Sequence, residues 1–168
     1  MTVADRIAVM SAGRIEQMAP PVEIYERPAS RYVADFLGDI ALVEGSVREA
    51  ADAMARLAAP DGTTLVGQTD ETLQPGATAW LAVRPEKFAI AREGAEPAAA
   101  NRLPGEVWDI AYLGGTTVFK VKLDAGPFAK VAVLNAHPGD DAAAGGPISW
   151  EERVVLTCRA EDALVLVR

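Results

Sequence analysis

Short runs of alternating apolar and polar residues recur along most of the chain, separated by Gly, Pro, Asn and Asp. The run Phe119–Leu123 has apolar residues at odd positions and lysines at even positions. The run Arg153–Arg159 likewise places Val154, Leu156 and Cys158 on one face. Because strand side chains alternate between two faces, such runs predict half-buried strands. From residue 39 onward, their recurrence predicts a mainly β protein, folded as a sheet or barrel.

The first 38 residues have a different pattern. Ile7–Met10 is apolar, a Gly-bearing turn follows, and Arg14–Met18 alternates, which predicts a β-hairpin. Pro20 and Pro21 then favour the start of a short helix over Val22–Arg27, which Pro28 ends.

A second helix is predicted over Arg31–Leu37, with Ser30 as its N-cap and Gly38 as its stop. Tyr32, Val33, Phe36 and Leu37 fall on one face of this helix. This apolar face needs a partner surface, which we expect to be the β part of the chain or another protein; otherwise the segment is disordered.

The stretch Leu81–Ile90 interrupts a strand. Leu81 and Val83 have odd numbers whereas Phe88 and Ile90 have even numbers, so the alternation changes phase within Arg84-Pro85-Glu86. The arginine and the acid suggest either a ligand clamp or a structural corner, and a corner is the favoured interpretation because bulges are common in barrels.

Composition and net charge argue against several classes of function. The chain has 168 residues, half of them hydrophobic, which suffices for one core or two small modules. Its formal net charge is −8 and it has no dense Lys/Arg run, which argues against binding of nucleic acid or anionic membranes. No apolar run approaches the roughly 20 residues of a membrane span, and the N-terminus lacks the pattern of a secretory signal, so we expect a cytoplasmic protein.

Few residues are suited to metal or thiol chemistry. Cys158 is the only cysteine and His137 the only histidine, so one chain has neither a disulfide nor the common structural zinc site. We expect Cys158 to be a buried, inert thiol because it alternates with Leu156 and Val154. Asp140, Asp141, Glu151 and Glu152 could bind a hard cation, but solvated loop carboxylates are the favoured interpretation.

Residues 1–38 closely resemble the end of the nucleotide-binding domain of ATP-binding-cassette import ATPases, through the stretch ADRIAVMSAGRIEQMAPPVEIYERPASRYVADFLG at residues 4–38. The most similar group is that of the spermidine/putrescine, iron and sugar importers. The resemblance implies that the hairpin and the two helices are left over from an α/β ATPase domain.

Residues 39–168 resemble the C-terminal accessory domain of the same family, the TOBE domain, which has an OB-like β fold. The family elements are Arg84, Pro85 and Glu86 in one stretch, and Gly105, Tyr112, Leu113 and Gly114 in another. The segment Val47–Pro60 has helix-favouring composition, but the family has two short strands there, and we therefore predict strands.

The sequence contains no G-x-x-x-x-G-K-[ST] phosphate loop, and the cassette signature and acidic strand of the family are also missing. We therefore expect this chain to be no enzyme and to bind no cofactor or metal, whereas a full-length parent would use ATP and Mg²⁺. The chain is then interpreted as a truncated form, or a split reading frame, of such an ATPase.

The resemblance also implies the partners. These are a second copy of the same subunit, an upstream ATPase domain and membrane permease subunits, at the inner face of the plasma membrane. The implied role is dimerisation and regulation in an importer, with polyamine as the suggested cargo. The alternatives are a stand-alone sensor for a small ligand or oxyanion and, opposed by the charge, an OB protein that binds nucleic acid.

Several residues have both a ligand-binding and a structural interpretation. Trp80, Trp108 and Trp150 could stack on a ligand, and Trp108 shares parity with Ile110 and Tyr112 as an aromatic stripe, but packing or dimer contacts are favoured. The segment from Gly114 through Gly115 and Thr116 could form an anion-binding nest, but a hairpin turn is favoured. The segments 93–105 and 137–148 are rich in Gly, Pro and Ala and are predicted to be disordered loops, His137 among them.

Overall fold

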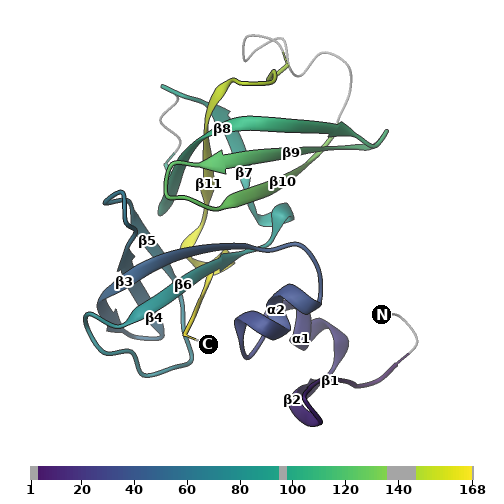
Figure 1. Cartoon of the computed structure of the whole chain (residues 1–168), viewed down its shortest axis with the longest axis vertical. Helices are drawn as coiled ribbons and strands as arrows, with labels where there is room; N and C mark the ends of the chain where they lie inside the picture. The colour runs from purple at the N-terminus through teal and green to yellow at the C-terminus, as the bar shows by residue number, and fades with distance from the viewer. Residues whose placement is uncertain (1–3, 95–97, 136–146, 168) are drawn as a thin grey trace.

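The computed structural model describes residues 4–94, 98–135 and 147–167. It has three parts: an N-terminal segment with a hairpin and two helices, a closed five-stranded barrel, and a second sheet of five strands (Figure 1). Within the described residues, no helix is long and apolar enough to cross a membrane.

The N-terminal segment folds as the sequence predicts. Strands β1 (Ile7–Ser11) and β2 (Arg14–Ala19) form the antiparallel hairpin, and helices α1 (Pro21–Glu26) and α2 (Arg31–Phe36) follow. Ser30 caps α2, because its hydroxyl accepts a hydrogen bond from the Val33 backbone N–H at 3.3 Å. Val33 belongs to a small core with Val9, Ala19 and Ile24, so one part of the apolar helix face is buried against the hairpin.

The barrel contains β3 (Ala41–Ala51), β4 (Met54–Ala58), β5 (Thr64–Gln68), β6 (Thr78–Val83) and β12 (Leu164–Leu166). The segment with helix-favouring composition forms the β3–β4 hairpin, which confirms the strands. Asp52 and Ala53 make its two-residue turn at φ 52° and 60°, the left-handed geometry that suits a tight hairpin. Pairing of β4 with β3 on one side and with β5 on the other therefore outweighs the helical preference of this segment.

The second sheet has the order β10-β9-β8-β11-β7. Its strands are β7 (Ala89–Arg92), β8 (Asn101–Tyr112), β9 (Thr116–Leu123), β10 (Phe128–Leu134) and β11 (Arg153–Cys158). The prediction of a loop over 93–105 was wrong from Asn101 on, because Asn101–Gly105 pair with β11. Asn101 is fully buried there, and its side chain exchanges hydrogen bonds with the Val66 backbone N–H (2.7 Å) and C=O (2.8 Å) in the barrel.

The barrel and the second sheet share one topology. In each, the first strand lies between the second and the fourth, giving β5-β4-β3-β6 and β10-β9-β8-β11. Each first strand carries a bulge, between Val47 and Glu49 in β3 and between Val107 and Asp109 in β8. The chain after the N-terminal segment therefore consists of two related β units.

The two units exchange their last strands. After β6 of the barrel, the 3₁₀ helix η1 (Pro85–Lys87) leads into β7 of the second sheet, and after β11 the 3₁₀ helix η3 (Ala160–Asp162) leads back into β12 of the barrel. The backbone before the two helices is nearly the same, with φ −74° and ψ 149° at Arg84 and φ −75° and ψ 155° at Arg159. The phase change seen in the sequence at Arg84-Pro85-Glu86 is thus a crossover between units.

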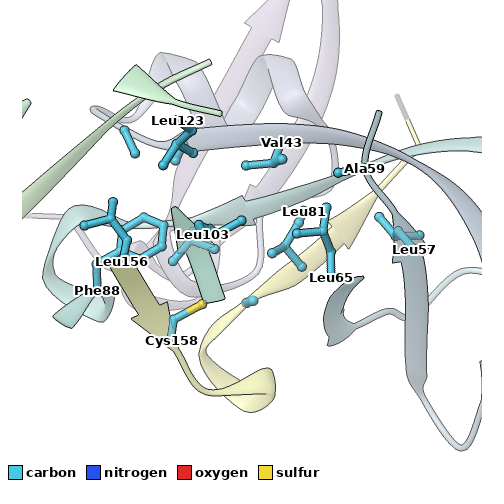
Figure 2. Packing of buried hydrophobic residues seen from close by; sticks show 14 of the residues in the cluster. Val43, Leu57, Ala59, Leu65, Leu81, Phe88, Leu103, Leu123, Leu156 and Cys158 are labelled. Atoms are coloured by element: carbon cyan, nitrogen blue, oxygen red, sulfur yellow. The ribbon is translucent and has the colours of Figure 1, made fainter. Parts of the chain in front are cut away.

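The exchange joins the two units through one continuous core (Figure 2). Val43, Leu65 and Leu81 of the barrel belong to the same buried cluster as Leu103 and Leu156 of the second sheet. Phe119, Val121 and Leu123 of β9 are buried and the intervening lysines are more exposed, which confirms the predicted alternation.

Candidate functional site

Arg84, the arginine of the first crossover, is buried against the N-terminal segment and is only 6% exposed. Its Nη1 donates to the backbone carbonyl oxygens of Gly38 (3.1 Å) and Asp39 (3.2 Å), and Nη2 lies 3.5 Å from that of Tyr25. The guanidinium also stacks on the Tyr25 ring, 4.2 Å from its centroid. Arg84 thus holds the ends of both N-terminal helices on the barrel.

Glu86 also contacts α1, through Tyr25, and it does not pair with Arg84. One of its carboxylate oxygens accepts a hydrogen bond from the Tyr25 hydroxyl at 2.8 Å. Burial, followed by this contact with Glu86, raises the pKa of Tyr25. Lys87 adds an ion pair with Glu26 at 3.4 Å, so η1, which begins at Pro85, is attached to α1 along its length.

A second arginine stack also joins the N-terminal segment to the barrel, and here the N-terminal segment supplies the arginine and the barrel supplies the ring. Arg31 at the start of α2 lies 3.6 Å above the ring centroid of Trp80 in β6. One ring face of Trp80 is therefore occupied by the chain itself. Ala34 of α2 completes the contact by packing with Ala82 and Leu166 of the barrel.

The second crossover repeats the Arg-x-Glu order as Arg159-Ala160-Glu161, but Arg159 does not contact the N-terminal segment in the hydrogen bonds and ion pairs of the described residues. Arg159 pairs with its own neighbours, Asp162 at 2.6 Å and Glu161 at 3.5 Å, and its side chain is 69% exposed. These contacts raise the pKa of Arg159, Asp162 having the larger effect. The comparison indicates that burial of Arg84 comes from the docked helices rather than from the crossover itself.

A cleft of about 340 Å³ lies where the N-terminal segment meets the barrel. Its polar groups largely satisfy one another. Arg27 pairs with Asp70 at 3.1 Å and donates to Gln68 at 3.3 Å. Gln17 bonds to the backbone of the α1–α2 connection. These contacts join the N-terminal segment to the barrel, and among the residues that line the cleft they leave no set of hydrogen-bond donors pointing toward a common anion site.

The glycine segment after β8 forms a tight turn. The Leu113 N–H donates to the Thr116 carbonyl at 2.8 Å, and Gly114 has φ 72°, a left-handed conformation that favours glycine. The carbonyls of Gly114 and Gly115 accept hydrogen bonds from Asn135 at 2.5 and 2.9 Å. The glycine carbonyls thus point toward Asn135, whereas an anion-binding nest would need the backbone N–H groups to point toward one site. Tyr112 and Leu113, the family-element residues before the turn, are strongly exposed.

Gly105 occupies a position where no larger residue fits. A Cβ atom there would lie 2.6 Å from the carbonyl oxygen of Lys122 and 2.8 Å from Val121 Cγ1. This close approach requires glycine in β8, next to β9. The Gly of this family element is therefore explained by strand packing.

The aromatic stripe over Trp108, Ile110 and Tyr112 is not formed. The bulge in β8 shifts the register at Trp108, whose ring meets Phe128 edge-on at a centroid distance of 5.6 Å. Ile110 instead packs against the core. Trp150 joins Trp108, because its indole N–H donates to the Trp108 carbonyl at 3.0 Å.

Of the four acidic residues considered for a cation, Asp140 and Asp141 lie outside the described residues. The predicted loop histidine, His137, also lies outside them. Glu152 pairs with Arg92 at 2.5 Å and accepts the Ser149 N–H at 2.7 Å. Its pKa is lowered, first by the Ser149 backbone and then by Arg92. The described part of the chain has no cluster of three or more His, Cys, Asp or Glu side chains suited to a metal.

Cys158 lies in the core at the end of β11 (Figure 2). Burial raises the pKa of its thiol to about 12. This environment confirms the predicted buried thiol and keeps it protonated near neutral pH.

Comparison with known proteins adds family information to this geometry. The family model described as TOBE domain matches residues 81–166. The chain is 36% identical over 174 residues to a spermidine/putrescine import ATP-binding protein, PotA, of Protochlamydia amoebophila, covering 100% of this chain and 44% of that protein. It is 34% identical over 168 residues to the putrescine transport ATP-binding protein PotG of Escherichia coli K12, covering 99% and 43%. The chain thus spans less than half the length of these curated relatives.

The fold comparison identifies a solved structure with a similar chain path. The cytoplasmic molybdate-binding protein ModG, crystallised with molybdate bound, superposes with a TM-score of 0.63 at 16% sequence identity. The match covers 84% of this chain and 99% of that one. At this identity the likeness concerns the fold alone.

Proposed function

Because this chain belongs to the TOBE domain family, we propose that it acts as the non-catalytic C-terminal part of the ATP-binding subunit of an importer, where it pairs two subunits and transmits regulation. The relatives that match nearly all of it are ATP-binding proteins of more than twice the matched length. The upstream part of such a subunit would bind ATP and Mg²⁺, since this sequence lacks a phosphate loop.

The observation that carries the proposal is the two-sided character of the N-terminal segment. One side is fastened to the barrel by Arg84, Glu86 and the Arg31–Trp80 stack. The other side exposes six large apolar side chains, which are Met10, Ile15, Met18, Val22, Tyr32 and Phe36. Exposed apolar surface of this kind marks a contact with another domain. An upstream ATPase domain would cover it and would be joined rigidly to the β units.

The cargo proposed for the transporter is a polyamine, on the basis of the names of both relatives. Selection of that cargo would belong to the permease and not to this chain. The complex would act at the cytoplasmic face of the membrane, with this chain held there through its partner subunits.

Pairing and catalysis are tested on the purified chain. Multi-angle light scattering across a concentration series should show a dimer, and ATP hydrolysis should remain at background. A chain that stays monomeric at high concentration contradicts pairing by this part of the subunit, and hydrolysis above background contradicts the non-catalytic role.

A second candidate function is a sensor for a small oxyanion, which the fold likeness to the molybdate-binding ModG favours. Thermal shift with molybdate and sulfate, and with spermidine and maltose for comparison, distinguishes it. A ligand that binds only the folded form raises the melting temperature in proportion to ln(1 + [L]/Kd). A rise with an oxyanion alone supports the sensor, and no shift with either oxyanion rejects it.

A further inference from the structure

We propose that the outer face of the second sheet, over β8, β9 and β10, is the surface through which two copies of this chain pair. This inference rests on the proposed pairing function and assigns it a site. We call the surface the aromatic face and define it by Trp108, Phe128 and Trp150, with Lys120 and Lys122 beside them.

The centre of the aromatic face is a cluster of partly exposed rings. Trp108, Phe128 and Trp150 are 55%, 40% and 63% exposed. They are fixed in place by the edge-on contact of Trp108 with Phe128 and by the hydrogen bond of the Trp150 indole to the Trp108 carbonyl. Rigid aromatic residues of this kind lose little entropy on binding and are enriched at the energetic centres of interfaces.

The three rings expose about half of the area that one partner of a standard dimer interface buries. With roughly 250 Å² for a whole Trp side chain and about 200 Å² for Phe, these three residues expose about 380 Å². A standard interface buries about 800 Å² on each partner, of which the apolar centre is only a part. The aromatic face therefore supplies such a centre, and the surrounding charged side chains supply its rim.

The charges around the rings suit a second copy of the same surface. Lys120 and Lys122 lie 4.6 and 4.8 Å from the Phe128 ring centroid. Asp109 and Glu106 lie opposite them in the strand register of β8 and β9. A two-fold interface must be self-complementary, and this face offers two cations, two acids and an apolar centre. A third lysine of the face, Lys130, lies opposite Lys120 in the register of β10 and β9, and it is paired with Asp39 at 2.8 Å. It is locally balanced in a chain of net charge −8, so two copies can meet here without the repulsion that the net charge causes elsewhere.

The test compares two substitutions of this face with one of the other apolar surface. Sedimentation equilibrium of the full 168-residue chain gives the dimer dissociation constant for the wild type, Trp108→Ser, Phe128→Ser and Phe36→Ser. Phe36 is the matched control, because it is an exposed aromatic on the N-terminal segment. We expect Trp108→Ser and Phe128→Ser each to raise the dissociation constant at least about 30-fold, as for an aromatic hot spot, and Phe36→Ser to change it less than about 3-fold.

A charge variant provides a second, independent measurement. Lys120→Glu combined with Lys122→Glu makes the face acidic, and the dimer should weaken at low salt and recover partly at high salt. Far-ultraviolet circular dichroism and melting temperatures of all variants establish that they remain folded.

The possible results separate the two proposals. A wild-type dimer that all three face variants leave intact, or that only Phe36→Ser disrupts, overturns the aromatic face while pairing itself stands. A wild-type chain that is monomeric at every concentration overturns pairing and the aromatic face together.

Discussion

The joint between the N-terminal segment and the barrel depends on Arg84, and its removal should have a large, localised effect. In Arg84→Ala, the carbonyls of Gly38 and Asp39 lose their donor inside a contact where Arg84 is almost fully buried. The stack on Tyr25 is lost as well. The helices α1 and α2 should then detach from the barrel more readily.

The magnitude follows from these contacts. Two hydrogen bonds from a charged donor contribute about 1.5 kcal/mol each at the low end of the usual range. The ring stack adds about 1 kcal/mol. The Nε atom of Arg84 has no hydrogen-bond partner among the described residues, which offsets part of this gain. We therefore expect a loss of about 3 kcal/mol, or roughly 6–12 °C in melting temperature for a chain of this size.

Two assays and one control check this expectation. Calorimetry measures the change in melting temperature, and hydrogen exchange read by mass spectrometry reports protection in residues 4–38 separately from the β units. Arg159→Ala is the matched control, since Arg159 holds the equivalent position in the second crossover but is exposed. Its ion pairs lie at the surface, where solvent screens them, so Arg159→Ala should change the melting temperature far less than Arg84→Ala. Equal effects of the two substitutions, or unchanged protection of residues 4–38 in Arg84→Ala, would refute the assigned role of Arg84.

Three further predictions concern the β units. Gly105→Ala should lower the free energy of unfolding, measured by chemical denaturation, by about 2–3 kcal/mol, because the added Cβ would overlap the β9 backbone. The control Gly115→Ala, where the Cβ would point into open space, should lower it by less than about 0.5 kcal/mol. Similar losses for the two substitutions would contradict the packing argument. Asn101→Leu leaves the backbone N–H and C=O of Val66 unpaired and should lower the free energy of unfolding by about 3 kcal/mol in the same assay. A loss below about 1 kcal/mol would show that water replaces the hydrogen bonds of the Asn101 side chain. Cys158 should resist alkylation at pH 8 until the protein unfolds. Because its pKa is higher in the folded state, the stability it contributes is present below pH 9 and is lost as the pH rises from about 9 to 12, which urea denaturation at several pH values measures.

Local alternation was enough to identify most elements. The buried positions of β9 and β11, the N-terminal hairpin and the capped helix α2 all follow from residues close together in the chain. Even the phase change at Arg84-Pro85-Glu86 was visible in the sequence, because parity is a local property. The loop over 93–105 was mispredicted because the partner that pairs with Asn101–Gly105, strand β11, lies about 50 residues away.

The sequence by itself determined that the chain is mainly β, that its strands have one buried face, and that something interrupts the strand at Arg84. The sequence also repeats Arg-x-Glu, and it has a glycine two residues before the bulge of each first strand, Gly45 in β3 and Gly105 in β8. These repeats become interpretable only when the strand orders of the two units are compared. Only the tertiary structure decided what Arg84 and Glu86 do. They belong to a crossover that carries the chain from one unit to the other, and their polar atoms are directed at Tyr25 and at the end of α2. These partners are 45 to 61 residues away, and local spacing does not specify contacts across such distances.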